Sequence, residues 1–248
     1  MKPTFRPELF VPLLAGHTRI GWLRPELAAR LRGWPKVFGS TPEEVKLLDK
    51  DALTPVVEQL AQEGFIPGWR NERYRIADLF DIERAAARPF GLTTRAVHVN
   101  GISADGKSMW LARRAGTKPI DPGLLDNLVG GGIATGLSIE QTLVKEAWEE
   151  AGIPNDLART ATRGGTVQVL REVPEGVQSE LIESYDLELP PGFQPKNQDG
   201  EVSEFLLLPF ERIEHQDLTF EAALVARDCL SRRSARPGSA PAGAGRAT

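Results

Sequence analysis

The most regular spacing of apolar positions in the chain lies between residues 138 and 153. Apolar residues recur there at intervals of three and four, which is the spacing of one helix face: Leu143, Val144, Ala147, Trp148 and Ala151. Ser138 and Gln141 form a capping box at the start, and Gly152 followed by Pro154 suits the end. The pattern predicts a helix over about 139–151 that buries this face against a sheet.

Helical spacing also dominates the first 90 residues. It predicts helices over 24–32, from a capping box at 41–44 to about residue 63, and over 82–88, with a strand within 69–76. We therefore expect residues 1–90 to form a small helix-rich α+β domain. This domain either shapes substrate access or supports a homodimer. Trp22, Trp34 and Trp69 either stack on an aromatic ligand or pack in its core, and because core packing is the commoner role we assign them no ligand.

In residues 91–233 the predicted secondary structure is mainly strand. The predicted strands cover residues 94–102, 107–114, 165–173, 178–189 and 203–209, and a last amphipathic helix covers 220–232. Strands, helix, strands and helix in this order predict a second domain with a mixed sheet between helices. Residues 234–248 are rich in Ala, Gly and Pro, and we expect them to form a disordered tail.

Three carboxylates lie beside the apolar face of the central helix: Glu146, Glu149 and Glu150. Glu146 and Glu150 are four residues apart and repel each other. The only nearby basic residue is Lys145, which can offset the charge of Glu149. Such a cluster is often no more than a solvated helix face. Here it follows the glycine run 130–132, where backbone can approach a ligand closely. The combination favours a joint site for Mg²⁺ or Mn²⁺ and a diphosphate, because these ions prefer carboxylate oxygens and substrate phosphates.

The stretch from Gly131 to Ile153 resembles the nudix box: a glycine, five residues, Glu, seven residues, then Arg-Glu-aliphatic-x-Glu-Glu-x-Gly-aliphatic. Two positions differ, since Lys145 stands for the Arg and Leu137 for the first Glu. The resemblance implies a metal-dependent hydrolase of diphosphate linkages with an α/β/α sandwich fold. It also implies metal ligands at the Gly131 carbonyl and at Glu146, Glu149 and Glu150, with Glu146 as a candidate general base.

Several strings outside the box carry the resemblance further. They are PFGL at 89–92, VHVNG at 97–101, WLARR at 110–114, LLDNLVGGG at 124–132, YDLELP at 185–190 and DGEVSEF at 199–205. Together they look like the nudix group related to thiamine pyrophosphokinase, whose members carry an extra N-terminal domain and commonly an aliphatic residue where Leu137 lies. This resemblance implies hydrolysis of thiamine diphosphate, or of its oxidised analogues, with release of phosphate.

Other candidate site residues lie outside the helix. Glu201 ends a polar loop, 190–201, whose backbone is free to cover a site. In nudix enzymes a further carboxylate outside the box often completes the metal site or positions water, so the resemblance makes Glu201 a candidate for this role and for accepting the proton; the alternative is an ordinary loop acid. Arg113 and Arg114 end a predicted strand, and either hold a substrate phosphate or are solvated. His98 lies inside a strand, where a packed, hydrogen-bonded histidine is more frequent than a general base.

Composition excludes some classes of function. The chain has 248 residues, of which 41% are hydrophobic and 26% charged, so one or two ordinary cores can form. No run reaches the length of a membrane span, and the N-terminus lacks the apolar segment of a signal peptide. The net charge of −4 argues against broad nucleic-acid binding. The single cysteine, Cys229, allows no internal disulfide and predicts a reducing, cytoplasmic setting.

Three alternatives to this function stay open. A nudix-fold binding module would hold a ligand without cleaving it, which Leu137 favours and the three helix acids oppose. Thiamine pyrophosphokinase activity itself would need a kinase domain, for which the chain looks too short. Another nucleoside diphosphate, such as a sugar nucleotide or a dinucleotide, would fit the same chemistry.

Overall fold

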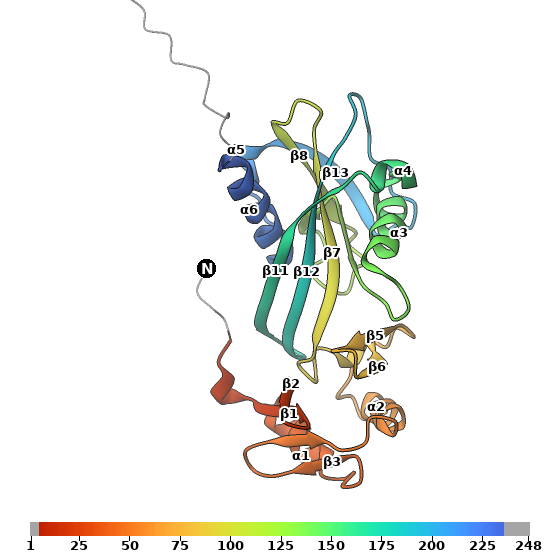
Figure 1. The fold of residues 1–248 in the computed structure, drawn as a ribbon, viewed down its shortest axis with the longest axis vertical. Coiled ribbons are helices and arrows are strands. Elements are labelled where there is room, and N and C mark those ends of the chain that lie inside the picture. The colour runs from red at the N-terminus through yellow and green to blue at the C-terminus, as the bar shows by residue number, and fades with distance from the viewer. Residues whose placement is uncertain (1–4, 236–248) are drawn as a thin grey trace, which may run out of the picture. The chain divides into compact units, whose positions relative to one another are not determined.

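The computed structural model describes residues 5–235, and these fall into two compact units. The N-terminal unit contains the chain up to Val97 together with Gly131–Thr142 and Gln168–Ile182. The C-terminal unit contains His98–Gly130, Leu143–Val167 and the chain from Glu183 onward. Figure 1 shows the elements of each unit.

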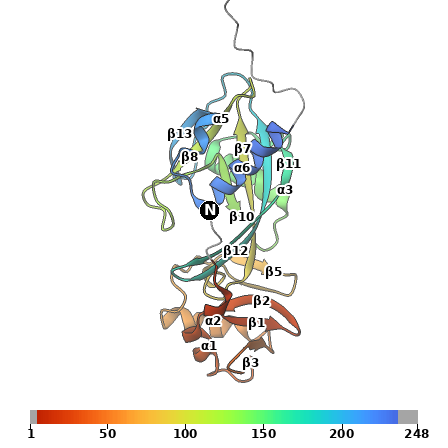
Figure 2. The same ribbon diagram turned by 90° about the vertical axis from the view of Figure 1, so that its left-hand side faces the viewer.

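The N-terminal unit is built from short strands and two helices. In chain order they are η1 (Pro7–Leu9), β1 (Val11–Ala15), β2 (Thr18–Leu23), α1 (Pro25–Leu31), β3 (Phe38–Ser40), β4 (Val45–Leu47), α2 (Leu53–Gln62), β5 (Arg73–Ile76), β6 (Phe80–Glu83) and η2 (Arg84–Ala86). One sheet has the order β2-β1-β4-β3 and is mixed, because β1 and β4 run parallel; β5 and β6 form a separate hairpin. Figure 2 shows the first sheet together with α1 and α2.

The predicted helix from residue 41 to residue 63 is wrong in its first half. The Thr41 hydroxyl does accept hydrogen bonds from the amides of Glu43 and Glu44, at 3.2 and 3.1 Å. These contacts close a turn between two strands, because Val45–Leu47 pairs with β1 and β3 as β4. Helix α2 begins only at Leu53. Strand pairing therefore overrides the local helical preference of this segment.

The other predictions for the N-terminal unit have mixed outcomes. The helix predicted over 24–32 is confirmed as α1, with its caps at Arg24 and Arg32. The helix predicted over 82–88 is wrong, since residues 82–83 end strand β6 and only the three-residue 3₁₀ turn η2 follows. Of the strand expected within 69–76, only Arg73–Ile76 forms. In the predicted tail, residues 236–248 lie outside the described part of the chain.

One seven-stranded sheet contains all the strands described between residues 93 and 235. The elements of this part are β7 (Thr93–Ile102), β8 (Ser108–Arg114), β9 (Leu125–Asn127), β10 (Val129–Gly132), α3 (Ile139–Ala151), α4 (Asn155–Ala158), β11 (Thr162–Val173), β12 (Gly176–Glu188), β13 (Val202–Pro209), α5 (Phe210–Ile213) and α6 (Phe220–Ser234). The sheet order is β11-β12-β7-β8-β13, with β10 beside β7 and β9 beside β8. The predicted 94–102 and 107–114 hairpin is confirmed as β7 and β8.

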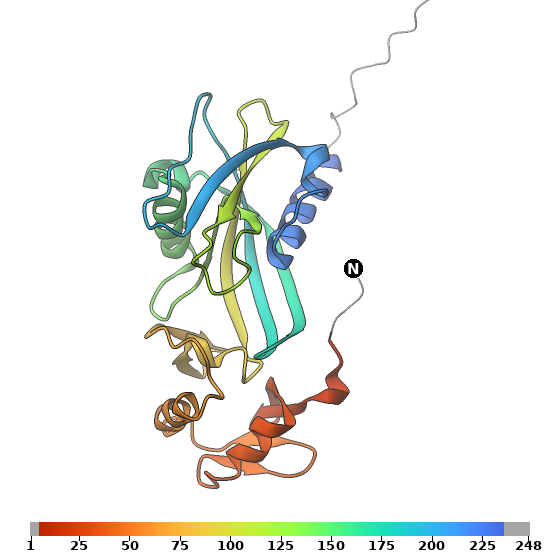
Figure 3. The same cartoon turned by 180° about the vertical axis from the view of Figure 1, so that it is seen from behind.

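Helices α3 and α6 lie on opposite sides of this sheet, as Figures 1 and 3 show. The layered arrangement of a sheet between helices is therefore confirmed. On one side, Ile102, Met109 and Leu111 of the sheet pack with Ala226 and Cys229 of α6. None of the helices within residues 5–235 is long and apolar enough to cross a membrane.

Helix α3 has the predicted ends. The Ser138 amide donates to Gln141 Oε1 at 2.8 Å, and the Gln141 amide donates to Ser138 Oγ at 3.1 Å. Gly152 has a φ of +63°, the left-handed conformation expected after the last turn. The predicted apolar face is wrong only for Trp148, which is 50% exposed. Trp148 lies about 100° around the helix from the fully buried Ala147, so it falls outside the face that meets the sheet.

Candidate active site

Glu150 is the most firmly held of the helix carboxylates. Its Oε2 accepts a hydrogen bond of 2.8 Å from the amide of Gly130, at the end of β10 nearest β9. The residue is only 8% exposed. A Cβ at position 130 would stand 3.2 Å from the His98 ring, so glycine lets this backbone amide pack close to the imidazole while it binds the carboxylate. The glycine run thus serves to orient an acid of α3.

The charged forms of two of these carboxylates, Glu146 and Glu150, are disfavoured by their surroundings. Burial raises the pKa of Glu150 well above its usual value; the neighbouring charges of Glu146 and Asp126 add to the rise, and the Gly130 amide opposes it. Burial also raises the pKa of Glu146, with repulsion from Glu149 and Glu201 adding to it and Lys145 opposing it. Buried acids with like-charged neighbours favour a cation close by.

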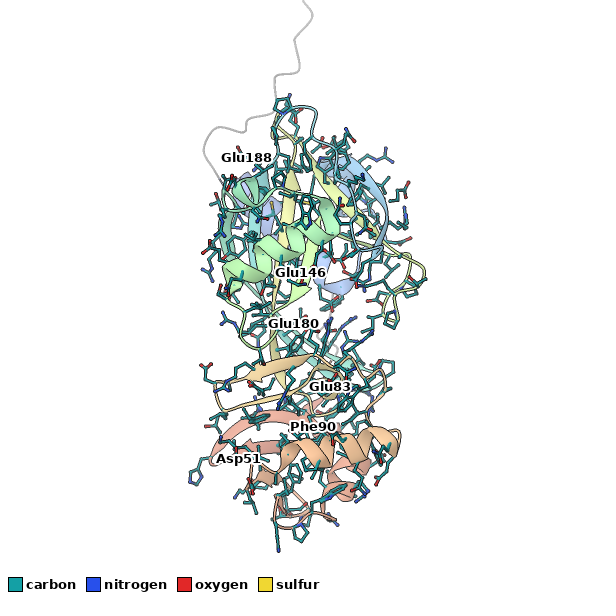
Figure 4. The ribbon with its side chains drawn as sticks, turned by 90° about the vertical axis from the view of Figure 1, so that its right-hand side faces the viewer. Asp51, Glu83, Phe90, Glu146, Glu180 and Glu188 are labelled. Atoms are coloured by element: carbon teal, nitrogen blue, oxygen red, sulfur yellow. The ribbon has the colours of Figure 1, made fainter. Side chains whose placement is uncertain are left out.

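Lys145 supplies part of that positive charge. Its Nζ lies 3.0 Å from Glu146 Oε1 and 2.6 Å from Glu149 Oε2. Burial alone would lower the pKa of Lys145, but its hydrogen bonds to Glu149 and Glu146 outweigh burial and raise it. Figure 4 labels Glu146 on α3. Lys145 neutralises Glu149 and Glu146 and leaves Glu150 without a basic partner in direct contact among residues 5–235.

A small pocket with a cavity volume of about 10 Å³ lies beside Glu150. It is lined by side chains of both signs: Arg114, Lys118, Asp126, Asn127, Glu150 and Glu201. Glu201 forms an ion pair with Lys118, and its side chain stays 46% exposed. The structure therefore brings the predicted Glu201 to the same pocket as Glu150. Lys118 and Asp126 belong to this pocket too. Lys118 lies in no recognisable motif, and Asp126 lies in the LLDNLVGGG string, where nothing marks its side chain as a site residue.

Only one of the two candidate arginines lies at the pocket. Arg114 lines the pocket, where its Nη1 lies 3.0 Å from Asp126 Oδ2 and its Nε donates to the carbonyl of Ile120. Arg113 is not among the residues that line the pocket; its Nε donates to Glu204 Oε2 at 2.7 Å, and Glu204 lies opposite it on β13. Arg114 is thus the candidate arginine that lies at this pocket, and its role as a phosphate ligand stays a prediction.

The polar loop 190–201 lies against the C-terminal end of α3. The Lys196 amide donates to the carbonyl of Ala151 at 2.9 Å, and the Gln198 amide donates to that of Glu149 at 2.8 Å. A Cβ at position 152 would stand 2.8 Å from the Lys196 carbonyl oxygen, so glycine is needed here for close approach as well as for its positive φ. These contacts place Glu201, which ends the loop, near the helix acids.

Two known domain families match most of the chain. A NUDIX domain matches residues 92–229, and a domain of unknown function, DUF4743, matches residues 2–94. The chain belongs to the Nudix family. Its fold is similar to the crystal structure of DR0079 from Deinococcus radiodurans, with a TM-score of 0.52 and 22% identity, covering 64% of this chain and 99% of that one.

Two plant Nudix relatives are similar in sequence over most of the chain. Nudix hydrolases 20 and 24, chloroplastic, of Arabidopsis thaliana are 36% and 37% identical to it over 229 and 222 residues, which is 82% of this chain in each case. The chain spans 61% of the length of each of them. The comparisons do not separate the thiamine pyrophosphokinase-related group from other Nudix proteins.

Nudix hydrolases generally use divalent metal ions, and the donors present suit such an ion. Within residues 5–235, no group of three or more His, Cys, Asp or Glu side chains stands in a metal-binding arrangement. However, carboxylate oxygen is the donor that Mg²⁺ and Mn²⁺ prefer. The buried carboxylate of Glu150, close to the charges of Glu146 and Asp126, is an acid that a divalent cation would stabilise. The ligand set Gly131, Glu146, Glu149 and Glu150 stays a prediction.

A buried hydrogen-bonded network extends from this Nudix pocket toward α6. His98 Nδ1 lies 2.7 Å from Asn127 Oδ1, and Asn127 Nδ2 donates to Asn100 Oδ1 at 3.0 Å. Asn100 Nδ2 donates to Asp186 Oδ1 at 3.0 Å, and Arg232 on α6 donates to the same carboxylate. His98 is 7% exposed. The favoured interpretation of His98 as a packed, hydrogen-bonded residue is therefore confirmed.

Asp186→Asn is expected to lower the free energy of unfolding by about 1–2 kcal/mol at pH 7, because Arg232 loses its charged acceptor. Burial tends to raise the pKa of Asp186, but hydrogen bonds from Arg232 and Asn100 outweigh it and the pKa is lowered. A carboxylate with a lowered pKa stabilises the fold above its unfolded pKa of about 4, and this stabilisation is lost as the pH falls through the folded value.

Denaturant unfolding between neutral and acid pH measures this effect. The difference in stability between the wild type and Asp186→Asn should shrink as the pH is lowered. A difference that stays constant down to about pH 3 would show that the charge of Asp186 does not stabilise the fold.

Proposed function

We propose that the chain is a metal-dependent pyrophosphohydrolase that cleaves a diphosphate linkage and releases phosphate. The single observation that carries this proposal is the position of Glu150. It is a buried acid, held by a backbone amide of the glycine run, at a pocket that also contains Arg114, Lys118 and Glu201. Acids with raised pKa values in a pocket with convergent charged groups are typical of catalytic sites.

Each side chain has a part in this proposal. Glu146, Glu149 and Glu150 would hold Mg²⁺ or Mn²⁺ together with the carbonyl of Gly131. When bound, the ion would neutralise charge on the diphosphate and acidify a water molecule. Glu146 or Glu201 would accept the proton of the attacking water. Arg114 and Lys118 would bind phosphate oxygens. Arg113, which does not line the pocket, would contact the substrate only at the edge of the site.

The substrate we propose is thiamine diphosphate or one of its oxidised analogues. Support comes from the strings outside the nudix box that resemble the thiamine pyrophosphokinase-related group, such as VHVNG at 97–101 and DGEVSEF at 199–205. Asn100 and Asp199, which lie in these strings, take part in buried or loop hydrogen bonds of the C-terminal unit. Another nucleoside diphosphate derivative is the alternative substrate.

A substrate panel tests this proposal. The protein would be incubated with Mg²⁺ or Mn²⁺ and thiamine diphosphate, its oxo and oxy analogues, ADP-ribose or NADH, and the products followed by ³¹P NMR. Conversion of a thiamine compound to its monophosphate with release of one phosphate is the expected result. Faster cleavage of ADP-ribose or NADH would support the alternative substrate class. Tight binding without cleavage of any compound would overturn the hydrolase and favour a binding module.

A further inference from the structure

The N-terminal unit contains a pocket of its own, larger than the one beside Glu150. It has a cavity volume of about 280 Å³ and is open to solvent. Its walls come from the first two turns of α2, the segment around Trp69, and the β5–β6 hairpin. This volume is close to the lower end, roughly 300 Å³, of the range of ligand sites for small molecules. All residues that line it belong to the N-terminal unit.

Trp69 is one of the residues that line this pocket. Its indole N–H donates to Asn71 Oδ1 at 2.8 Å, so the polar edge of the ring is already satisfied. The residue is nevertheless 38% exposed. Trp22 and Trp34 differ, since arginine side chains cover their rings at 4.4 and 4.0 Å. Among residues 5–235 no arginine or lysine covers Trp69, and its face is available to a ligand.

The polar lining of the pocket is predominantly acidic. Glu58, Asp81 and Glu83 line it together with one cation, Arg73. Asp81 is paired with Arg75 outside the lining, at 3.2 Å, and Arg73 Nη2 donates to the Asp81 carbonyl. Glu58 and Glu83 have no basic partner within the described residues. The pocket therefore carries two carboxylates that form no ion pair with a described residue, against one cation in the lining, Arg73.

Glu83 is the more informative of these two carboxylates. It is 6% exposed, and Figure 4 labels it in the N-terminal unit. Its Oε1 accepts the amides of Arg70 and Ala85 at 2.9 and 3.2 Å. Its Oε2 has no hydrogen-bond partner among residues 5–235. A buried carboxylate held in place by one oxygen, with the other unpartnered at a pocket wall, is suited to bind a cationic or proton-donating group.

We propose that this pocket binds a planar aromatic cation, with the ring stacked on Trp69 and the positive charge facing Glu83 and Glu58. The indole face attracts a cation through its quadrupole, and the two carboxylates add Coulombic attraction. The apolar side chains of Leu53, Val57 and Ile82 complete the contact with the ring. The site is independent of the proposed hydrolase activity, because it uses none of its residues.

Binding of two isosteric probes tests this site. The cation 1-methylquinolinium and the neutral 1-methylnaphthalene have the same shape and differ in charge. Titration of the whole chain would be followed by NMR through the indole N–H signal of Trp69, which is assigned by its absence in Trp69→Ala. We expect the cation to bind roughly tenfold more tightly than the neutral ring. Equal affinities, or no shift of the Trp69 signal, would overturn the proposal.

Charge variants sharpen the test. Glu83→Gln keeps an oxygen that can accept both backbone amides, and Glu58→Gln changes an exposed residue on α2, so the second variant remains informative if the first unfolds. Both should weaken binding of the cation several-fold and leave the neutral ring unaffected. Glu43→Gln, an exposed acid outside the pocket, is the matched control and should change neither. A loss of cation binding in Glu43→Gln equal to that in Glu58→Gln would refute a specific site.

Discussion

Glu150→Gln is expected to lower kcat for diphosphate cleavage by roughly 10²–10³-fold, the cost of removing a preoriented charged group from an active site. Glutamine keeps the shape of the side chain and can still accept the hydrogen bond from the Gly130 amide. It cannot supply the negative charge that a divalent ion needs. The assay is the initial rate of phosphate release from the fastest substrate of the panel, at saturating Mg²⁺.

Stability separates this effect from a folding defect. Burial raises the pKa of Glu150, so the charged form is disfavoured in the folded protein without metal. Glu150→Gln should therefore unfold in EDTA at the same temperature as the wild type or a higher one. Glu140→Gln, in the first turn of the same helix, is the control and should keep its activity. Full activity of Glu150→Gln would remove this residue from the catalytic site.

Gly91→Ala is expected to destabilise the N-terminal unit by roughly 3 kcal/mol. Gly91 has a φ of +57°, and a Cβ there would stand 2.5 Å from the carbonyl oxygen of Trp22 and 2.7 Å from its amide nitrogen. Because these are backbone atoms of strand β2, they can move only by disturbing the sheet. The Trp22 amide also donates to the Phe90 carbonyl at 3.0 Å, and that bond would be strained.

Gly16→Ala isolates the steric part of this effect. Gly16 has a φ of +60°, nearly the same as Gly91, but a Cβ there would have no atom within 4 Å. Its alanine variant should lose only about 1 kcal/mol, which is the cost of the left-handed conformation alone. Denaturant unfolding followed by tryptophan fluorescence gives both values. Equal losses in the two variants would show that the contact with Trp22 does not matter.

The C-terminal part of the fold could be predicted from the sequence because its elements are long. Helix α3 carries its own start and stop signals, and strands β7 and β8 are joined by a short turn at Gly106. The exposure of Trp148 was missed because the width of the buried face depends on what α3 packs against. That partner is set by tertiary structure and not by spacing alone.

The N-terminal part could be predicted less well because its strands are short. Val45–Leu47 has only three residues, and nothing local distinguishes it from the start of a helix. Its strand conformation comes from pairing with β1, which lies about 30 residues earlier in the chain. Such long-range pairing has no signature in a window of a few residues.

The residues of the candidate site also differ in how well they could be predicted from the sequence. The acids of α3 were predicted because they share one helix face next to a glycine run. Glu201 was found through the family resemblance, and the structure places it at the pocket of Glu150. Lys118 reaches this pocket from a loop that carries no pattern. Asp126 reaches it from strand β9, within the LLDNLVGGG string, where the resemblance did not single out its side chain. The exposure of Trp69 likewise depends on which residues surround it in the folded chain, and the sequence alone does not predict it.

Binding of Mn²⁺ tests most directly whether the acids of α3 form a metal site. The free ion is counted by its electron paramagnetic resonance signal during titration of the protein at pH 7.5, without substrate. The wild type should bind Mn²⁺ saturably, and Glu146→Gln, Glu149→Gln and Glu150→Gln should each weaken binding by about tenfold or more, whereas Glu140→Gln should not. Identical Mn²⁺ binding by the wild type and a variant with all three changes would contradict a metal site on α3.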